Sequence, residues 1–440
     1  MGSRNNMDLK FIFRALRYRN YRLFFGGQRI SLIGTWMQQM ALSWLVYRMT
    51  ESAFLLGLVA FVGQISAFFL APLAGVIVDR RSPYRLLFVT QFAAMLQAAT
   101  LAGLYLSGHL EFWHIILLSL MSGTINAFDI PCRQVFVIEL IDDKKDLNNA
   151  IALNASMVNM ARMVGPSVAG LLIVLAGEGM CFLLNAISYL AVIGSLLAIR
   201  IAAKTIDPNK PPMWTQLKEG FTYAYQFMPI RTLLMLVWLV SLVGGGFQTM
   251  MPVFARDIFH GGPRTLGLLM GATGLGALSG AIFLANRQNA RGLGKIIALM
   301  AGLFGVGVML FAVSKLKSVS LALAFLTGFG LMVQLAASNT VLQIIAEEDK
   351  RGRVMSFYTM AFMGAAPIGG LLAGMSAAHL GVHKTLFLGG LCCIAGALVF
   401  IKNLPILREK IRPIYIKKGI IPEVAEGIQS ATIIEDFPGG

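Results

Sequence analysis

The chain has 440 residues, of which 57% are hydrophobic and 13% are charged, and its mean hydropathy is +0.71. Soluble domains carry roughly a quarter charged residues, so this composition excludes a water-soluble globular protein. The formal net charge is +16, and the four cysteines have no metal-ligand spacing, which argues against a disulfide framework.

Apolar runs of spanning length recur along nearly the whole chain. A helix needs about 20 apolar residues to cross the hydrocarbon core of a bilayer. We therefore predict an all-α polytopic membrane protein with 12 transmembrane helices in two six-helix pseudo-repeat halves. The expected spans are 23–47, 53–78, 85–106, 112–131, 149–175, 179–199, 232–255, 265–285, 294–314, 319–344, 353–378 and 383–404.

The predicted spans divide the chain into five segments. Two six-helix halves are expected at 23–199 and 232–404, joined by a central cytoplasmic linker at 200–231. A cytoplasmic N-terminal segment (1–22) and a cytoplasmic C-terminal tail (405–440) complete the chain. "VAGLL" in the first half recurs as "IGGLL" in the second, a weak repeat typical of transporters built from two parallel halves.

The distribution of basic residues predicts the orientation. With both termini cytoplasmic, 29 of the 37 Lys and Arg residues fall inside and 6 outside, and only Arg29 and Arg162 lie within spans. This asymmetry is what the positive-inside rule requires. The positive charge therefore indicates orientation and contact with anionic membrane lipids, and we expect no nucleic-acid partner.

"GVIVDRRSPYR" (75–85) follows the second predicted span and contains Gly75, Asp79, Arg80 and Arg85. It resembles the loop motif between the second and third spans of the major facilitator superfamily. The resemblance implies that the glycine permits close helix packing and that the acid caps or pairs across the inner gate. It also implies that the basic residues reach a carboxylate on the fourth span.

Further segments resemble one bacterial subfamily of that superfamily. These are "FDIPCRQVFVIEL" (128–140), "LNNAIALNASMVNMARMVGPSVAG" (147–170), and residues 27–47 and 351–374. The subfamily contains the enterobactin exporters, macrolide efflux proteins and transmembrane secretion effectors. The resemblance implies the major facilitator fold, a bacterial inner-membrane location and proton-coupled export by alternating access. The substrate would be a bulky amphipathic small molecule, siderophore-like or drug-like.

Arg162 lies in the middle of the fifth predicted span, with Asn154 and Asn159 on either side of it on the helix. A charge at this depth is costly and faces protein or water rather than lipid. No Asp or Glu lies deep in any predicted span, so Arg162 has no obvious counter-charge. Two interpretations stay open: a structural arginine, or a cavity-lining cation that meets an anionic or carbonyl-rich substrate.

The remaining charged residues near the membrane are candidates for gating or proton coupling. We expect Asp129 to pair with Arg29, or alternatively with Arg80 or Arg85 through the gate implied by the resemblance, or to be solvated in the loop. The full set of predicted gating or coupling residues is Gly75, Asp79, Arg80, Arg85, Asp129, Arg133, Arg29 and Asp257.

Polar and aromatic side chains of both halves suggest a binding cavity for an amphipathic ligand. Besides Arg162, the predicted substrate-binding residues are Asn154, Asn159, Trp36, Gln38 and Gln64 in the first half and Phe247, Gln248, Gln334 and Tyr358 in the second. Gly165 and Pro166, with Pro367 and Gly369 in the second half, are predicted hinges; simple helix packing is the alternative interpretation.

Other classes of site lack supporting residues. His379 and His383 have no third ligand, so no metal site is predicted, and no phosphate-binding loop supports ATP as the energy source. We therefore expect no enzyme and no cofactor, with a proton gradient as the driving force. The expected partners are a small amphipathic substrate and membrane lipids, and the expected state is a monomer. A lipid or lysophospholipid translocator of the same fold is the alternative function.

Overall fold

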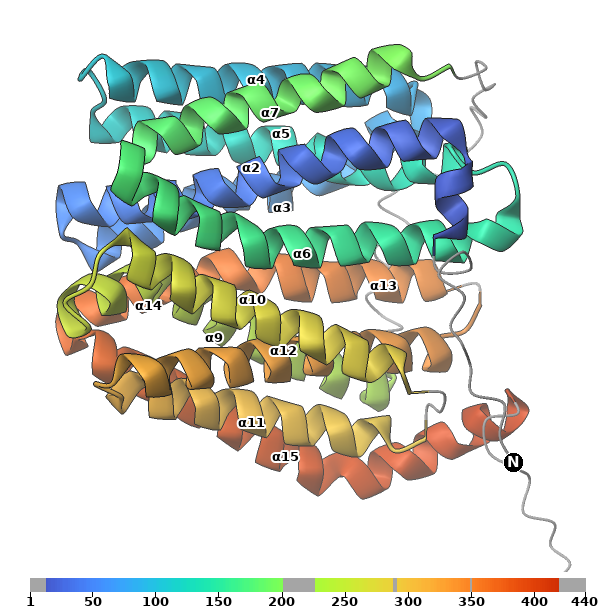
Figure 1. Cartoon of the computed structure of the whole chain (residues 1–440). Coiled ribbons are helices and arrows are strands. Elements are labelled where there is room, and N and C mark those ends of the chain that lie inside the picture. The colour runs from blue at the N-terminus through green and yellow to red at the C-terminus, as the bar shows by residue number, and fades with distance from the viewer. Residues whose placement is uncertain (1–12, 201–225, 288–290, 349, 419–440) are drawn as a thin grey trace, which may run out of the picture.

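The computed structural model describes residues 13–200, 226–287, 291–348 and 350–418. Within these ranges the regular elements are helices, and they run side by side in one bundle (Figure 1). Seven positions inside helices are described by their backbone alone: residues 71, 72, 75, 76, 79, 80 and 144.

The N-terminal half is a bundle of six long helices preceded by a short 3-10 helix. In it, α2 packs on α6 and α7, while α5 packs on α3 and α4. The elements are η1 (Arg14–Arg17), α2 (Arg19–Thr50), α3 (Ala53–Arg80), α4 (Pro83–Leu106), α5 (Phe112–Glu139), α6 (Lys144–Ala176) and α7 (Glu178–Ala198).

The C-terminal half contains two helices that are each interrupted or extended by a π-helical turn. Here α10 packs on α12, α11 on α12 and α15, and α9 on α14. The elements are α9 (Met228–Val253), η2 (Phe254–Ile258), α10 (Pro263–Ala285), α11 (Leu293–Val313), α12 (Lys317–Ile345), α13 (Arg351–Thr359), η3 (Met360–Gly364), α14 (Ala365–Leu380) and α15 (Val382–Lys417).

Eleven helices among the described residues are long and apolar enough to cross a membrane. Each corresponds to a predicted span, with the run from α13 to α14 counting as one. The helix at the first predicted span, α2, is 32 residues long but is not among the eleven. Polar residues such as Gln28, Arg29 and Gln38 lower its hydropathy, and two of these three are buried inside the bundle.

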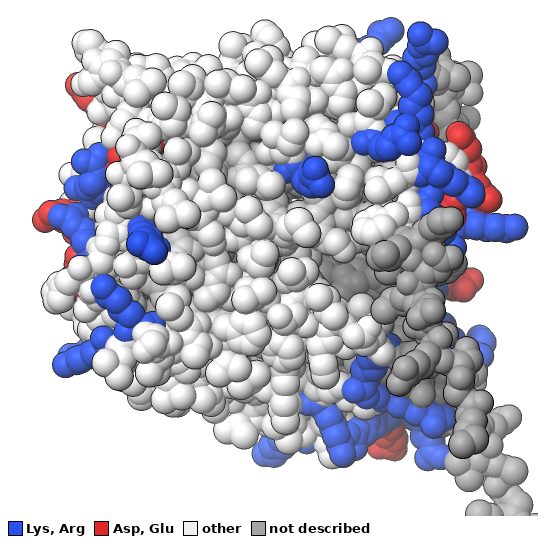
Figure 2. Space-filling view, viewed as in Figure 1, with Lys and Arg blue, Asp and Glu red and all other residues white. Residues whose placement is uncertain are grey.

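The surface of the bundle has the polarity pattern of a membrane protein. Large apolar side chains point outward from many helices; Leu175 is 82% exposed, Phe69 69% and Leu197 67%. Figure 2 shows Lys, Arg, Asp and Glu gathered mainly at the two ends of the helices, with a broad and mostly uncharged surface between them in which a basic side chain also lies. A water-soluble bundle would bury such side chains, whereas lipid solvates them.

Close helix packing inside each half depends on glycine. A Cβ at Gly369 of α14 would lie 1.8 Å from the Leu242 carbonyl oxygen of α9, and one at Gly276 of α10 would lie 2.0 Å from the Phe325 oxygen of α12. Neither site accepts a side chain without moving a helix. Small residues let membrane helices approach until their backbones touch, which maximises van der Waals contact in lipid.

The structure bears on two predicted segment boundaries, the start of the C-terminal tail and the end of the central linker. Helix α15 does not end near 404 but continues to Lys417, through Pro405 and Pro413, so the predicted tail begins as helix. Most of the predicted linker lies outside the described residues, which resume at 226, and α9 begins at Met228.

Candidate functional site

The two halves meet along α6 and α10 through a row of small residues. A Cβ at Gly267 of α10 would lie 2.6 Å from the Pro166 carbonyl oxygen, and one at Gly274 would lie 2.8 Å from the Met163 Cα and 3.1 Å from the Arg162 oxygen. Nearer the start of α10, a Cβ at Gly170 would lie 2.9 Å from the Pro263 oxygen. These contacts run from the α6–α7 turn inward as far as Arg162.

A second contact, between α3 and α14, joins the halves at the same end. A Cβ at Gly57 would lie 2.6 Å from the Gly370 carbonyl oxygen, and one at Gly374 would lie 2.6 Å from the Ala53 oxygen. We call this end of the bundle, which holds Glu51 and Gly177 in its turns, the outer end. Toward the opposite, inner end, the α10 ribbon diverges from α6 (Figure 1), and we call the region between the two halves inward of Arg162 the wedge.

The side chain of Arg162 points into the protein, away from lipid. Met160, Leu171 and Leu175 of α6 are 48%, 52% and 82% exposed, and they mark the lipid face of the helix. At 100° per residue they lie about 160° to 220° around the helix from Arg162. Ala155, which shares the face of Arg162 one to two turns nearer the inner end, is also exposed. We therefore predict that this face of α6 lines the wedge.

Trp36 of α2 holds the guanidinium of Arg162. The Arg162 Cζ lies over the indole ring, 4.9 Å from its centroid, a cation–π contact. Gly165 makes this approach possible, because a Cβ there would lie 2.6 Å from the Trp36 Cβ. The Arg162 Nε is buried without a hydrogen-bond partner, and no described carboxylate lies within ion-pair distance of the guanidinium.

The other predicted ligands of the N-terminal half divide into two groups. Gln38 is buried, and its amide bonds only within its own half: it donates to the Gln97 Oε1 (3.2 Å) and accepts from the Asn185 Nδ2 (2.8 Å). Gln64 is exposed, and Asn154 and Asn159 are half-buried, with the Asn159 amide donating to the Ala155 oxygen of its own helix. Gln38 thus ties α2 to α4 and α7 rather than facing the wedge.

The predicted ligands of the C-terminal half also differ in their surroundings. Phe247 is buried and packs edge-on against Phe311, so it belongs to the core. Gln334 is buried as well, and its Oε1 has no hydrogen-bond partner. Gln248 is exposed, and the Tyr358 hydroxyl donates to the Leu335 oxygen at 3.1 Å.

The predicted ion pair between Arg29 and Asp129 is wrong for this structure. Asp129 is buried and bound by Arg133 on its own helix, while Thr90 and Gln91 of α4 donate to its Oδ1 at 3.0 and 2.6 Å. Arg29 is exposed. The alternative partner Arg85 is exposed too and does not reach Asp129 either. An arginine four residues away on the same helix satisfies a buried carboxylate without requiring a second helix to approach.

Helix α2 also contributes to the Asp129 cluster. With the Gln28 amide in the orientation that its surroundings favour, its oxygen accepts from the Arg133 Nη1 (2.9 Å) and Nε (3.1 Å). The cluster therefore links α2, α4 and α5 at the inner end of one half. The side chains of Asp79 and Arg80, and the surroundings of Gly75, lie outside what the structure describes, so the predicted inner gate stays a prediction.

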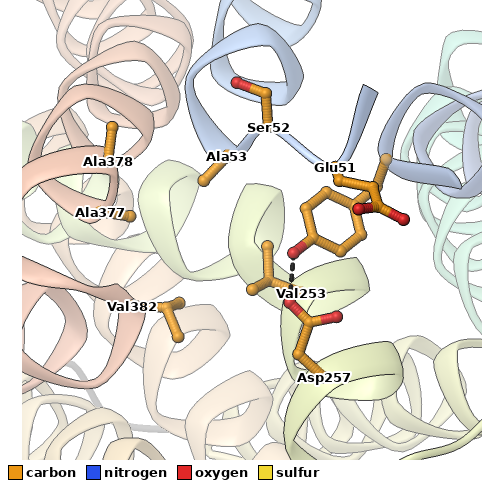
Figure 3. A pocket seen from close by; sticks show the side chains of 9 residues that line it. Glu51, Ser52, Ala53, Val253, Asp257, Ala377, Ala378 and Val382 are labelled. Carbon is orange, nitrogen blue, oxygen red and sulfur yellow. Dashed lines mark hydrogen bonds between the residues drawn. The ribbon is translucent and has the colours of Figure 1, made fainter. Parts of the chain in front are cut away.

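At the outer end, Asp257 takes part in a contact between the halves. The Tyr47 hydroxyl of α2 donates to the Asp257 carboxylate of η2, and the Arg256 Nη2 lies 2.5 Å from the Glu51 Oε1. We call these four residues the outer latch. Three of them, Tyr47, Glu51 and Asp257, border a cavity of about 380 Å³, which α3, α14 and α15 also line. Figure 3 shows Glu51 and Asp257 in the wall of this cavity.

Asp257 is predicted from the sequence as a coupling residue, but the other three residues of the outer latch are not. Tyr47, Glu51 and Arg256 look like ordinary polar ends of spans, and pairing between the first and seventh spans leaves no sequence signal. The π-helical turn η2, which presents Arg256 and Asp257 together, was not predicted either. Pro252 shortly before it was the available clue, because proline disturbs the hydrogen-bond ladder of a helix.

The predicted hinges lie at contacts between helices. Helix α6 continues through Pro166 without interruption, and both Gly165 and Pro166 are buried, the first against α2 and the second against α10. In contrast, Pro367 closely follows the π-helical turn η3, whose wider backbone suits a residue without an N–H donor. Packing is evident at these positions, and bending stays a prediction.

Comparison with known proteins identifies the family. A family model described as a transmembrane secretion effector matches residues 12–415. The staphyloferrin A transporter of Staphylococcus aureus (strain NCTC 8325 / PS 47) is 25% identical over 382 residues, which cover 86% of this chain and 95% of that protein. Macrolide efflux protein A of Streptococcus pyogenes is 24% identical over 404 residues, covering 87% and 96%.

Solved structures agree with these matches at the level of the fold. A POT family transporter in complex with a thioalcohol-conjugated peptide superposes with a TM-score of 0.71 at 12% identity, covering 88% of this chain and 96% of that one. The family model extends over both halves and the wedge between them, and the matched relatives are transporters. The chain therefore belongs to the transmembrane secretion effector family of the major facilitator superfamily, and it is a multi-pass bacterial membrane protein.

Proposed function

We propose that the protein is a secondary-active exporter of a bulky amphipathic small molecule across the bacterial inner membrane. It has twelve spans, with α2 as the first, and both termini are cytoplasmic. The observation that carries the proposal is the wedge, in which two halves touch at one end and diverge at the other from Arg162 inward. Such an arrangement gives a substrate access from one side at a time.

The orientation follows from the distribution of charge. The positive-inside rule places the inner end, where most Lys and Arg lie, in the cytoplasm. In that orientation the wedge is open to the cytoplasm and closed toward the outside by the outer latch and the α6–α10 contact. Export then requires the halves to rock, so that the outer contacts separate while the inner ends meet.

The nature of the substrate is proposed from the relatives and from the walls of the wedge. The named relatives transport a siderophore or expel macrolides. In this chain, Arg162 and Trp36 offer a charge and an aromatic surface side by side. The exposed Gln64 and Gln248, which we predict to face the wedge, add polar groups. An amphipathic molecule matches that combination.

We propose the proton gradient as the driving force, with Asp257 as the carboxylate that responds to it. Of the three candidates, Asp129 is already bound within its own half, and the side chain of Asp79 is not described. Asp257 is exposed, and its hydrogen-bond partner Tyr47 belongs to the other half, so the state of this carboxylate is tied to separation of the outer ends.

Transport by the purified full-length chain in proteoliposomes tests the proposal. The probe is dansyl-L-glutamate, an amphipathic carboxylate, and its flux is followed with and without an imposed pH gradient. We expect saturable flux that the gradient accelerates. Flux that does not change with the pH gradient would contradict proton coupling but not transport. If flux does not exceed that of protein-free liposomes, export of such molecules is contradicted.

A disulfide across the outer latch tests alternating access. The native cysteines are replaced by serine, and Tyr47→Cys is combined with Asp257→Cys. Because Asp257 is the proposed coupling carboxylate, flux in this variant is measured down a substrate gradient without an imposed pH gradient. We expect oxidation to stop this flux, because the outer ends can no longer separate, and reductant to restore it. As a matched control, Tyr105→Cys with Glu178→Cys joins two residues that already bond within one half, and oxidation of that pair should leave flux unchanged.

A further inference from the structure

The vertex of the wedge carries a cation with no anion of its own. Two buried carboxylates of the N-terminal half are already paired: Asp129 is bound by Arg133, and Glu178 at the outer end is bound by Arg48 at 2.8 Å. Among the described residues, no carboxylate reaches Arg162, and no hydrogen-bond partner reaches its Nε. A buried or half-buried charge is stable only when solvated or paired, so a ligand group is the natural complement.

The guanidinium is also held in a fixed orientation. Its carbon lies over the Trp36 ring, and Trp36 in turn is held against the backbone of α6 where Gly165 leaves no Cβ. With one face of the guanidinium on the indole, its N–H groups remain for a ligand. A planar fork of donors matches a carboxylate in two parallel hydrogen bonds, which an ammonium group does not offer.

We infer that Arg162 and Trp36 form an anion subsite that takes the carboxylate of an amphipathic substrate. The carboxylate binds the Nη groups of Arg162, and the apolar part of the ligand rests on the indole and on apolar walls of the wedge. This inference rests on the proposed function in one respect, namely that the wedge is the substrate cavity. It adds a charge preference: anionic ligands bind, and cationic amphipaths of equal size are repelled.

Three probes that share one fluorophore separate charge from size. Dansyl-L-glutamate is anionic, dansylamide is neutral and dansylcadaverine is cationic. Their dissociation constants are measured by fluorescence anisotropy on the purified full-length protein in nanodiscs of zwitterionic lipid, which removes attraction to lipid headgroups. For the unmodified protein we expect dansyl-L-glutamate to bind at least tenfold more tightly than dansylcadaverine.

Substitutions assign the preference to Arg162. In Arg162→Gln we expect the dissociation constant of dansyl-L-glutamate to rise at least tenfold and that of dansylamide to change less than twofold. Arg162→Lys should recover part of the loss, since it restores charge without the fork. Trp36→Phe should weaken all three probes to a similar, smaller degree. Lys402→Gln removes an exposed charge from α15 and serves as the matched control.

Other outcomes contradict the subsite. Equal weakening of all three probes by Arg162→Gln would show a structural role, and so would weakening of dansyl-L-glutamate by Lys402→Gln to the same extent. Preference of the unmodified protein for dansylcadaverine would overturn the inference outright. Displacement of dansyl-L-glutamate by lysophosphatidylcholine but not by citrate would point to the lipid translocator instead.

The binding and flux experiments distinguish failure of the anion subsite from failure of the proposed export function. If binding is anion-selective and depends on Arg162 but no flux is seen in proteoliposomes, the anion subsite is supported and export is contradicted. If the dansyl probes are transported at rates that do not depend on their charge, transport is supported and the anion subsite is contradicted.

Discussion

The guanidinium of Arg162 on α6 lies over the indole of Trp36 on α2, at the level where α6 and α10 part. One contact therefore joins the interior of the N-terminal half to the vertex of the wedge. The cation–π interaction contributes about 0.5–2 kcal/mol, which is less than the cost usually assigned to an unpaired charge within a membrane. This difference is the reason why we propose that Arg162 serves a ligand rather than stability.

Removing the charge of Arg162 should cost little stability. We expect Arg162→Gln to lower the free energy of unfolding by at most about 2 kcal/mol, the upper value for its contact with Trp36. Thermal denaturation of the purified protein, monitored by intrinsic fluorescence, measures the change against Lys402→Gln. A loss on the scale of a broken buried ion pair, about 3–5 kcal/mol, would identify Arg162 as part of a structural pair.

A bulky side chain in the α6–α10 contact should open the outer end. Gly274→Leu places atoms where a Cβ alone would lie 2.8 Å from the Met163 Cα, so the helices must separate. We expect the distance between spin labels at His109→Cys and Lys315→Cys, both exposed at the outer end, to increase. Gly103→Leu is the control, because a Cβ at Gly103 meets nothing within 4 Å. An unchanged distance between the spin labels in Gly274→Leu would mean that the α6–α10 contact does not hold the outer end closed.

Breaking the outer latch should also increase the separation of the outer ends of the two halves. Tyr47→Phe removes the hydroxyl that bonds Asp257 across the two halves, whereas Tyr105→Phe removes one that bonds Glu178 at 2.6 Å within one half. A hydrogen bond to a charged group contributes about 1.5–3 kcal/mol. We expect only Tyr47→Phe to broaden the distance distribution toward separated outer ends. Equal distributions for both variants would show that the latch is incidental.

The Asp129 cluster should govern stability rather than transport. Asp129→Asn leaves Arg133 with a neutral partner in a buried site, and we expect a loss of about 3–5 kcal/mol in unfolding free energy. In the double variant Asp129→Asn with Arg133→Gln, much of that loss should be recovered. Thermal denaturation of the two variants checks this. Retained stability together with lost pH-driven flux would instead make Asp129 the coupling carboxylate.

Local patterns predicted most of the fold. Runs of apolar residues located the spans, and the predicted starts and ends lie close to those of helices such as α4 and α11. The end of α15 was missed because the basic residues after 404 are helix formers that also suit a solvated tail. The π-helical turns η2 and η3 were missed because their causes involve neighbouring helices as well as local sequence.

Pairings across the bundle were harder to predict than positions along it. Arg162 stood out because a charge is rare at that depth, and the structure places it over Trp36, but that both line a substrate cavity stays a prediction. The partner of Asp129 was missed because Arg29 was chosen for its similar depth in the membrane. Arg133, four residues along the same helix, was already within reach. Gln38 was assigned to the cavity although its amide bonds to Gln97 and Asn185, since an amide in a span looks the same in either role.

Thiol labelling on the face of Arg162 is the sharpest test of whether this face lines a substrate cavity. In a variant without native cysteines, Ala155→Cys lies on that face and Met160→Cys lies on the lipid face of the same helix. A membrane-impermeant maleimide is applied to the cytoplasmic side of inside-out vesicles, with and without dansyl-L-glutamate. We expect rapid labelling of Ala155→Cys that dansyl-L-glutamate slows, and little labelling of Met160→Cys. Equal labelling of both positions, or no protection at Ala155→Cys, would contradict a substrate wedge at Arg162.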